Sequence, residues 1–208
     1  MTNFINLITQ TADKFEQMIQ THCTNLTTIP TEDFGWINHR WYSKQFRLAH
    51  VERFEQPKFS VLHTVIFPHL TDPSPIFGFD IIASDTKATG LFFDFSPTVD
   101  DYGVISSNVW SEPRERPEWG TIFSEHWIAC RPSFQEAETI SYLACELLSK
   151  YLSELGTKTT EHVPQVIEKQ NQYSLNQRQN THTTRVLMKI LGPERGQYFV
   201  ENILFPTI

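Results

Sequence analysis

The sequence contains the run Val61-Leu62-His63-Thr64-Val65-Ile66-Phe67-Pro68, whose β-branched and aromatic side chains are typical of a β-strand. Apolar residues occupy both alternating sets of positions, which indicates that both faces of this strand are covered. Runs of similar character lie before and after it, separated by short polar connections, and such connections predict an antiparallel meander. The runs span residues 36–42, 47–54, 59–67, 76–83 and 89–95.

Apolar residues at helical spacing predict helices on both sides of this strand region. One expected helix covers residues 4–26, and another begins at Ser133, whose hydroxyl can cap the helix while Glu136 reaches back to it. Further helical patterns cover residues 161–178, 181–191 and 194–204. We therefore expect residues 1–208 to form a single α/β domain, a three-layer α/β/α sandwich whose central antiparallel sheet has helices on both faces.

The overall charge and hydropathy disfavour two classes of partner. With 17 basic and 24 acidic side chains the net charge is −7, which disfavours binding to nucleic acid or to an anionic membrane. No apolar run is long enough to span a bilayer, and no basic targeting segment follows Met1. We expect a cytoplasmic protein, and we also expect it to be a monomer.

Glycine and cysteine are both scarce, with 8 and 3 residues respectively. No glycine falls into a phosphate-binding motif, so classical nucleotide binding is not favoured. Cys23, Cys130 and Cys145 form no Cys-x-x-Cys pair, so we expect small buried apolar residues rather than disulfides or ligands of zinc or an iron–sulfur cluster. The aromatic content of 13% suits either a large core or a cavity for a flat conjugated ligand.

Titratable residues interrupt the expected strands, where a buried unpaired carboxylate is costly. His50 and Glu52 are two positions apart and therefore share one strand face. His63, Asp80 and Asp94 each lie inside an otherwise apolar run. Each residue alone is more often a hydrogen-bonded core residue or a solvent-facing one. Because antiparallel neighbours bring such residues together, the group of His50, Glu52, His63 and Asp80 favours proton chemistry on one sheet face.

Two other chemistries stay open for the same residues. His50 and His63, with Glu52 or Asp80, match a site in which two histidines and one carboxylate bind a metal ion. A hydrolase nucleophile is less supported, because no Gly-x-Ser-x-Gly elbow occurs and Ser96 precedes a proline in an expected turn.

Several motifs, in order along the chain, resemble those of one enzyme family. The segments His50-Val51-Glu52, residues 61–68 and Phe77-Gly78-Phe79-Asp80 resemble the active-site strands of ferredoxin-dependent bilin reductases. Further segments are similar to the phycocyanobilin:ferredoxin oxidoreductase branch of that family, namely residues 95–98, 119–125, 131–133 and 184–205. The resemblance runs from about Trp36 to the last residues of the sequence.

The resemblance implies an α/β/α sandwich that holds biliverdin IXα between the sheet and the C-terminal helices. Family members bind no flavin, nicotinamide or metal, so no cofactor is expected. Electrons come one at a time from reduced ferredoxin, and the protein supplies protons to bilin radicals in a four-electron reduction. The alternative is a bilin carrier or chaperone that holds the pigment without reducing it.

The resemblance also assigns catalytic roles. Asp80 matches the central proton donor beneath the bilin, and His63 matches its hydrogen-bonded partner. Glu52 and His50 match the acid and the histidine near the D-ring. This arrangement is physically reasonable, because a carboxyl group desolvated against a flat apolar ligand can keep its proton near neutrality, and histidine can then return a proton from solvent.

Residues expected to bind the substrate also follow from the resemblance. Arg114 matches an arginine that pairs with a propionate, and Thr89 matches a hydroxyl that contacts one. Asn180 and Val186 match residues that line the pocket, as does Phe205; plain core packing is as good an interpretation for Val186 and Phe205. The chain departs from the family pattern at the next two residues of the pocket segment, with Thr181 where an aspartate is common and His182 where a lysine is usual.

These departures bear on the product. Glu52 favours reduction at the D-ring and hence phycocyanobilin. Thr181 and the short stretch of residues 97–114 favour phycoerythrobilin, the product of compact phage-associated relatives, which we take as the first expectation.

Charge patterning bears on the electron donor. Residues 40–58 contain five basic and two acidic side chains, and residues 178–195 contain four basic and one acidic. Two segments of net charge +3 on an acidic protein could guide an acidic ferredoxin in a transient complex.

Overall fold

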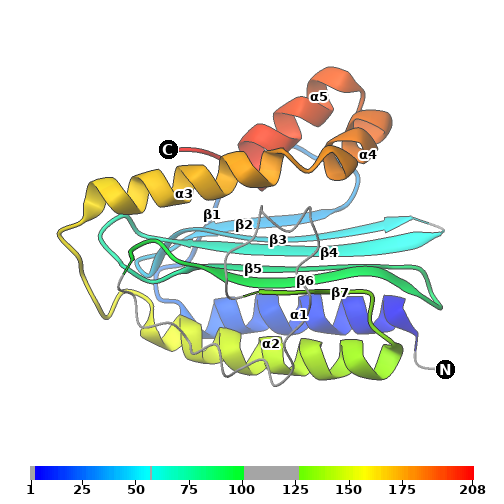
Figure 1. The fold of residues 1–208 in the computed structure, drawn as a ribbon, viewed down its shortest axis with the longest axis horizontal. Coiled ribbons are helices and arrows are strands. Elements are labelled where there is room, and N and C mark those ends of the chain that lie inside the picture. The colour runs from blue at the N-terminus through cyan, green and yellow to red at the C-terminus, as the bar shows by residue number, and fades with distance from the viewer. Residues whose placement is uncertain (1–2, 57, 101–126) are drawn as a thin grey trace.

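A computed structural model describes residues 3–56, 58–100 and 127–208. The described residues form three layers, with one antiparallel sheet between two layers of helices (Figure 1). This confirms the expected fold class. No helix within these ranges is long and apolar enough to cross a membrane.

The sheet is a meander in which each strand pairs with its neighbour in the sequence. Its strands are β1 (Thr27–Thr28), β2 (Ile37–Tyr42), β3 (Phe46–Gln56), β4 (Phe59–Pro68), β5 (Ile76–Ala83), β6 (Ala88–Ser96) and β7 (Trp127–Cys130). The five expected runs correspond to β2 to β6, with ends that differ by at most two residues. The short edge strands β1 and β7 were not expected, because two and four residues carry too little periodicity.

Helices α1 (Phe4–His22) and α2 (Phe134–Glu154) cover one face of the sheet. The expected cap of α2 is present, since the Ser133 hydroxyl accepts a hydrogen bond from the Glu136 backbone N–H. Helix α1 stops at His22, four residues earlier than expected, where Cys23 takes an extended conformation. Apolar side chains of β3 to β6 face these two helices and form the larger core, in which the Phe15 ring packs edge-on against Phe77 at 5.9 Å between centroids.

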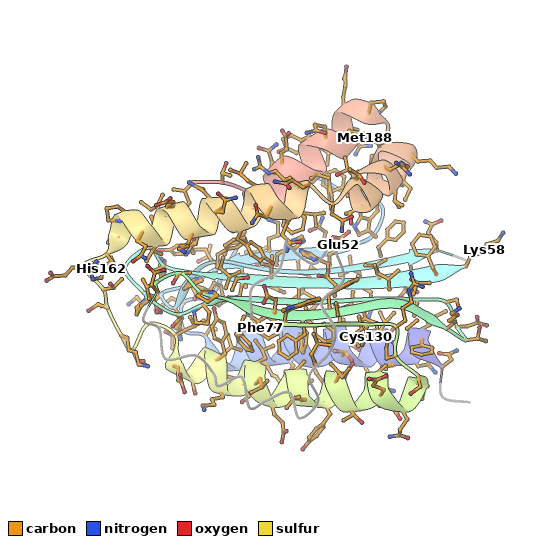
Figure 2. All side chains as sticks on the ribbon, in the orientation of Figure 1. Glu52, Lys58, Phe77, Cys130, His162 and Met188 are labelled. Carbon is orange, nitrogen blue, oxygen red and sulfur yellow. The ribbon has the colours of Figure 1, made fainter. Side chains whose placement is uncertain are left out.

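Helices α3 (Val163–Arg178), α4 (Thr181–Leu191) and α5 (Pro193–Tyr198) lie over the opposite face (Figure 1). The π-helix η3 (Phe199–Leu204) follows, so the single helix expected over 194–204 is divided into two types. The core on this side is smaller, and the sheet residues in it are Leu48, Val65, Phe67 and Ile76. In Figure 2, Glu52 lies toward these helices, whereas Phe77 lies toward α1 and α2.

None of Cys23, Cys130 and Cys145, all of which the structure describes, forms a disulfide. Cys23 and Cys145 are buried as expected, whereas Cys130 at the end of β7 is half-buried. Burial raises the pKa of the Cys23 thiol to about 11, so it remains protonated.

Candidate active site

The register of the sheet places the expected catalytic residues side by side. Glu52 on β3 lies directly opposite His63 on β4, and His63 lies directly opposite Asp80 on β5. His50, one row along the same face, is the diagonal neighbour of His63, and their ring centroids are 5.5 Å apart. All four side chains therefore face the layer of α3 to α5, as the period of two along each strand requires.

His63 and Asp80 form the closest polar pair of the site. His63 Nδ1 lies 2.6 Å from Asp80 Oδ1, and the two side chains are 7% and 32% exposed. Burial by itself lowers the pKa of His63, but the charge of Asp80, the hydrogen bond to it and the charge of Glu52 outweigh burial and raise that pKa. The His63 imidazole therefore keeps its proton more readily than a free histidine and shares a short hydrogen bond with the Asp80 carboxyl group.

Glu52 is buried beside this pair. The Trp36 indole N–H donates a 2.7 Å hydrogen bond to Glu52 Oε1. Burial raises the pKa of Glu52 to about 7, against the opposing effects of the His63 charge and the Trp36 hydrogen bond. Glu52 is thus an acid that is partly protonated near neutrality, which is the state required of a proton donor.

His50 is fully buried and lies on the same strand as Glu52, two residues earlier. Its Nε2 is 2.6 Å from Asn38 Oδ1 on β2, so Nε2 carries the hydrogen and donates it to the amide oxygen. Burial, together with the positive charges of His63 and Arg40, lowers the pKa of His50 well below its usual value, which keeps the ring neutral. His50 is therefore an acceptor at Nδ1 rather than a source of charge.

Two buried ring nitrogens of the site have no hydrogen-bond partner within the described residues, namely His63 Nε2 and His50 Nδ1. Buried polar atoms are nearly always hydrogen-bonded in folded proteins. Their presence on one sheet face, under a layer of helices, fits a polar ligand that reaches both rings.

Two aromatic side chains, Tyr173 on α3 and Phe205 directly after η3, lie on the helix side of the site. The Phe205 ring lies edge-on to His63 at 5.5 Å between centroids, and the Tyr173 ring packs on Phe67. Arg178 holds Phe205 in this place, since its guanidinium donates hydrogen bonds to the backbone carbonyl of Phe205 at 2.8 and 3.0 Å. Phe205, expected to line the pocket, thus lies beside His63.

Four other residues expected to bind substrate lie in the first half of α4 or directly before it. Asn180 caps α4, and its side-chain oxygen accepts a hydrogen bond from the Thr183 N–H. Thr181 begins α4 at an exposed position, His182 follows in the same helix, and Val186 is half-buried one turn further on.

Of the two residues expected to contact the propionates, Thr89 is exposed at the start of β6. Its hydroxyl donates a hydrogen bond to the Ile82 carbonyl at 3.2 Å. Arg114 lies outside the described residues.

Sequence reasoning missed several residues that complete the site. Trp36 and Asn38 hold Glu52 and His50, although only the alternation of polar residues along β2 could have pointed to Asn38. Asp94 interrupts an apolar run in the sequence, but that interruption alone indicates no role. The sequence pattern predicts that Tyr173 lies in a helix, but it does not predict that Tyr173 reaches the site. A local pattern does not show how α3 packs on the sheet.

The geometry does not support the alternative of a metal site. Within residues 3–56, 58–100 and 127–208, no three or more His, Cys, Asp or Glu side chains are grouped so that they could hold a metal ion. His50 instead bonds to Asn38 and His63 to Asp80.

Several basic residues of the two positively charged segments, residues 40–58 and 178–195, form contacts within the protein. Arg47 bonds to Gln170 and Arg178 to backbone carbonyls, while Arg195 pairs with Glu32. The basic residues of these segments that are exposed in the structure are Lys44, Lys58, Arg185, Lys189 and Arg195. The positive surface is therefore smaller than the sequence count indicated.

Comparisons with known proteins identify the family of the chain. The chain is similar to the phycocyanobilin:ferredoxin oxidoreductase of Trichodesmium erythraeum, with 29% identity over 228 residues that cover 97% of this chain and 93% of that protein. The enzyme of the same name from Prochlorococcus marinus is 32% identical over 193 residues, covering 84% of this chain and 76% of the relative.

Two solved structures share the fold. The structure of PcyX superposes with a TM-score of 0.69 at 26% identity, covering 96% of this chain and 98% of that one. Tomato phytochromobilin synthase, solved in complex with biliverdin, superposes with the same TM-score at 14% identity, covering 93% and 80%. At that identity the second match establishes the shared fold only.

The family model described as ferredoxin-dependent bilin reductase matches residues 9–206. With nearly the whole chain matched, and with the acid–base residues together on one sheet face, the expected family is confirmed: the chain belongs to the ferredoxin-dependent bilin reductases and is an oxidoreductase.

Proposed function

We propose that this enzyme reduces biliverdin IXα by four electrons from reduced ferredoxin, with the bilin held between the sheet and helices α3 to α5. The observation that carries the proposal is the hydrogen-bonded His63–Asp80 pair with Glu52 directly beside it on a buried sheet face. A related fold, that of tomato phytochromobilin synthase, is known in complex with biliverdin.

The residues of this face suit stepwise protonation. Reducing two double bonds takes four electrons and four protons, and a one-electron donor such as ferredoxin makes bilin radicals that must be protonated between electron transfers. The His63–Asp80 pair supplies one proton at a time, with His63 Nε2 free to donate to a lactam oxygen. Glu52, with a pKa of about 7, supplies a second donor position. These groups hold at most two protons at once, so they take up the remaining protons from solvent between electron transfers.

Phycoerythrobilin is the product we propose first. The supporting observation is Thr181, a residue without an acid function at the position where the family pattern has an aspartate linked to A-ring reduction. Phycocyanobilin is the second candidate, favoured by the buried, partly protonated Glu52 and by the names of the relatives. Replacing Glu52 with Gln tests the role of Glu52. A changed ratio of the two products assigns Glu52 to reduction at the D-ring, and an unchanged ratio removes it from that role.

The rival function is a carrier that binds biliverdin without reducing it. A carrier has no use for proton donors, and the site described above contains several. The test is anaerobic incubation of purified protein with biliverdin and reduced ferredoxin, followed by chromatography of the pigments. Conversion to a phycobilin supports the enzyme; unchanged biliverdin, in a reaction where a known reductase is active with the same ferredoxin, establishes the carrier.

We further propose that ferredoxin docks on the exposed basic residues, with Lys58 on the β3–β4 turn and Lys189 on α4 among them. Electrostatic steering of this kind raises the encounter rate more than the affinity, and it weakens with salt. A fall in the apparent second-order rate with rising ionic strength, at constant ferredoxin, is therefore expected.

A further inference from the structure

Two diagonal hydrogen bonds connect the acid–base residues of β3 to the segment that forms β2. Asn38 lies directly opposite Glu52 in the register, yet its side chain bonds to His50, two positions from Glu52. Trp36, two residues before Asn38, likewise donates its indole N–H to Glu52 Oε1 at 2.7 Å. Both residues of β3 are therefore held by neutral side chains that lie on the same sheet face.

The turn before β2 and the packing of three rings direct the Trp36 indole. Gly35 has a φ of +86°, which favours glycine, and its N–H donates a hydrogen bond to Asp33 Oδ1 at 2.7 Å. Three phenyl rings contact the indole, with centroids between 4.9 and 5.8 Å from it, those of Phe54, Phe199 and Phe34. This packing restrains rotation of the indole, so the direction of its N–H is fixed.

The hydrogen bond from Trp36 decides which oxygen of Glu52 carries the proton. Among the hydrogen bonds within the described residues, the Trp36 N–H is the only donor to this carboxyl group. An indole nitrogen donates and does not accept, so Oε1 is the acceptor whether Glu52 is ionised or protonated. In a protonated carboxyl group the carbonyl oxygen is the better acceptor. Oε1 is therefore the carbonyl oxygen, and the hydroxyl lies at Oε2.

We propose that Trp36 is a positioning residue that keeps the proton of Glu52 on Oε2, so that Glu52 donates from one fixed atom. The inference rests on the proposed function, in which Glu52 is a second proton donor. A donor atom with one fixed position reaches one part of a flat ligand. Trp36 thereby also influences which double bond of the bilin is reduced.

The same hydrogen bond opposes the effect of burial on Glu52. Burial raises the pKa of Glu52 to about 7, the His63 charge and the Trp36 hydrogen bond lower it, and the Asp80 charge raises it. Other charged or titratable side chains on this sheet face, or over it from α3, include Arg40, His50, Asp94, Tyr173 and Arg178. All of these stay in place when position 36 loses its N–H, so a change in the titration of Glu52 reports the hydrogen bond.

The test is infrared spectroscopy of the ligand-free protein at pH 5, where Glu52 is protonated. Subtracting the spectrum of Glu52→Gln identifies the carbonyl band of the Glu52 acid. A carbonyl group that accepts a hydrogen bond absorbs at lower wavenumber than a free one, so Trp36→Phe should move this band to higher wavenumber. If the proton were on Oε1, the carbonyl oxygen would be Oε2 and the band would not move.

A pH titration of the same band measures the strength of the hydrogen bond. Trp36→Phe should move the titration of Glu52 to higher pH by about half a unit to one unit, because the lost bond stabilises the carboxylate more than the acid. Placing 3-benzothienylalanine at position 36 should have both effects, since this residue keeps the shape of the indole but has no N–H. It serves as the second variant if the smaller phenyl ring disturbs the packing.

Trp41→Phe is the matched control. Trp41 lies on β2, is 5% exposed and belongs to the larger core on the other sheet face, so its replacement should change neither the band nor the titration. The inference is overturned if the band or the titration is unchanged in both variants at position 36, folded by circular dichroism. These measurements use neither biliverdin nor ferredoxin, so a failure of the proposed function would show in the pigment assay and not here. If both hold, Trp36→Phe should change the ratio of products in the same direction as Glu52→Gln.

Discussion

Replacing Glu52 with Gln should remove a pH dependence of folding stability that the wild-type protein has. The pKa of Glu52 is about 7 in the folded protein because the side chain is buried, and its ordinary value is 4.5. Between these two pH values the folded protein holds a proton that the unfolded chain releases, so the free energy of unfolding falls as pH rises through this window and is level above it. The loss amounts to about 3 kcal/mol by pH 8.

The Gln side chain is neutral at every pH, and its amide oxygen can still accept the hydrogen bond from Trp36. The assay is urea denaturation of both proteins in a series of buffers from pH 5 to pH 8. The difference in unfolding free energy, wild type minus variant, should fall by about 2–3 kcal/mol across that range. Glu55→Gln is the control, because Glu55 lies on the same strand with its side chain 51% exposed. A pH-independent difference between wild type and Glu52→Gln would refute the placement of Glu52 as a buried acid.

Three further outcomes are expected. Asp80→Asn should bind biliverdin, as seen by absorption titration, yet turn over roughly 10²–10⁴-fold more slowly, because an amide cannot donate a carboxyl proton; wild-type turnover would remove Asp80 from the mechanism. Phe15→Ala should lower the free energy of unfolding by about 3–5 kcal/mol in denaturant titrations, because its ring is fully buried, while biliverdin affinity on the opposite sheet face stays unchanged; a loss below about 1 kcal/mol would contradict the packing described. Lys58→Glu should raise the KM for ferredoxin roughly two- to tenfold with little change in kcat, whereas Lys14→Glu on α1 should not; equal kinetics for both variants would place the docking surface elsewhere.

Local patterns were sufficient for most of the secondary structure. The bounds of β5 were predicted to the residue, because residues 76–83 are an apolar and aromatic run interrupted only by Asp80. Helix α4 was likewise predicted over 181–191, since a Gly-Pro break follows it. The π-helix η3 was not, because hydrogen bonds between residues five apart leave no distinct apolar period in six residues.

The grouping of the residues proposed as proton donors was also predictable from a local pattern. Polar residues on one face of consecutive antiparallel strands must lie near one another, so the sequence alone places Glu52, His63 and Asp80 together. The contacts that hold them were not predictable in the same way. Trp36 reaches Glu52 from before the start of β2, and Tyr173 reaches Gly78 from a helix almost 100 residues away. Such contacts depend on how layers dock, which a strand or helix period does not encode.

The strand order has a consequence for how this protein forms. Because β1 to β6 pair only with sequence neighbours, the loops closed in making these hairpins are short, and the entropy lost in closing them is small. Pairings of this kind can form as the chain leaves the ribosome, well before α3 to α5 are synthesised. The sheet face that carries His63 and Asp80 would then be finished first and covered last. On this order of events, the face with Glu52, His63 and Asp80 would stay open to water until α3 to α5 dock over it.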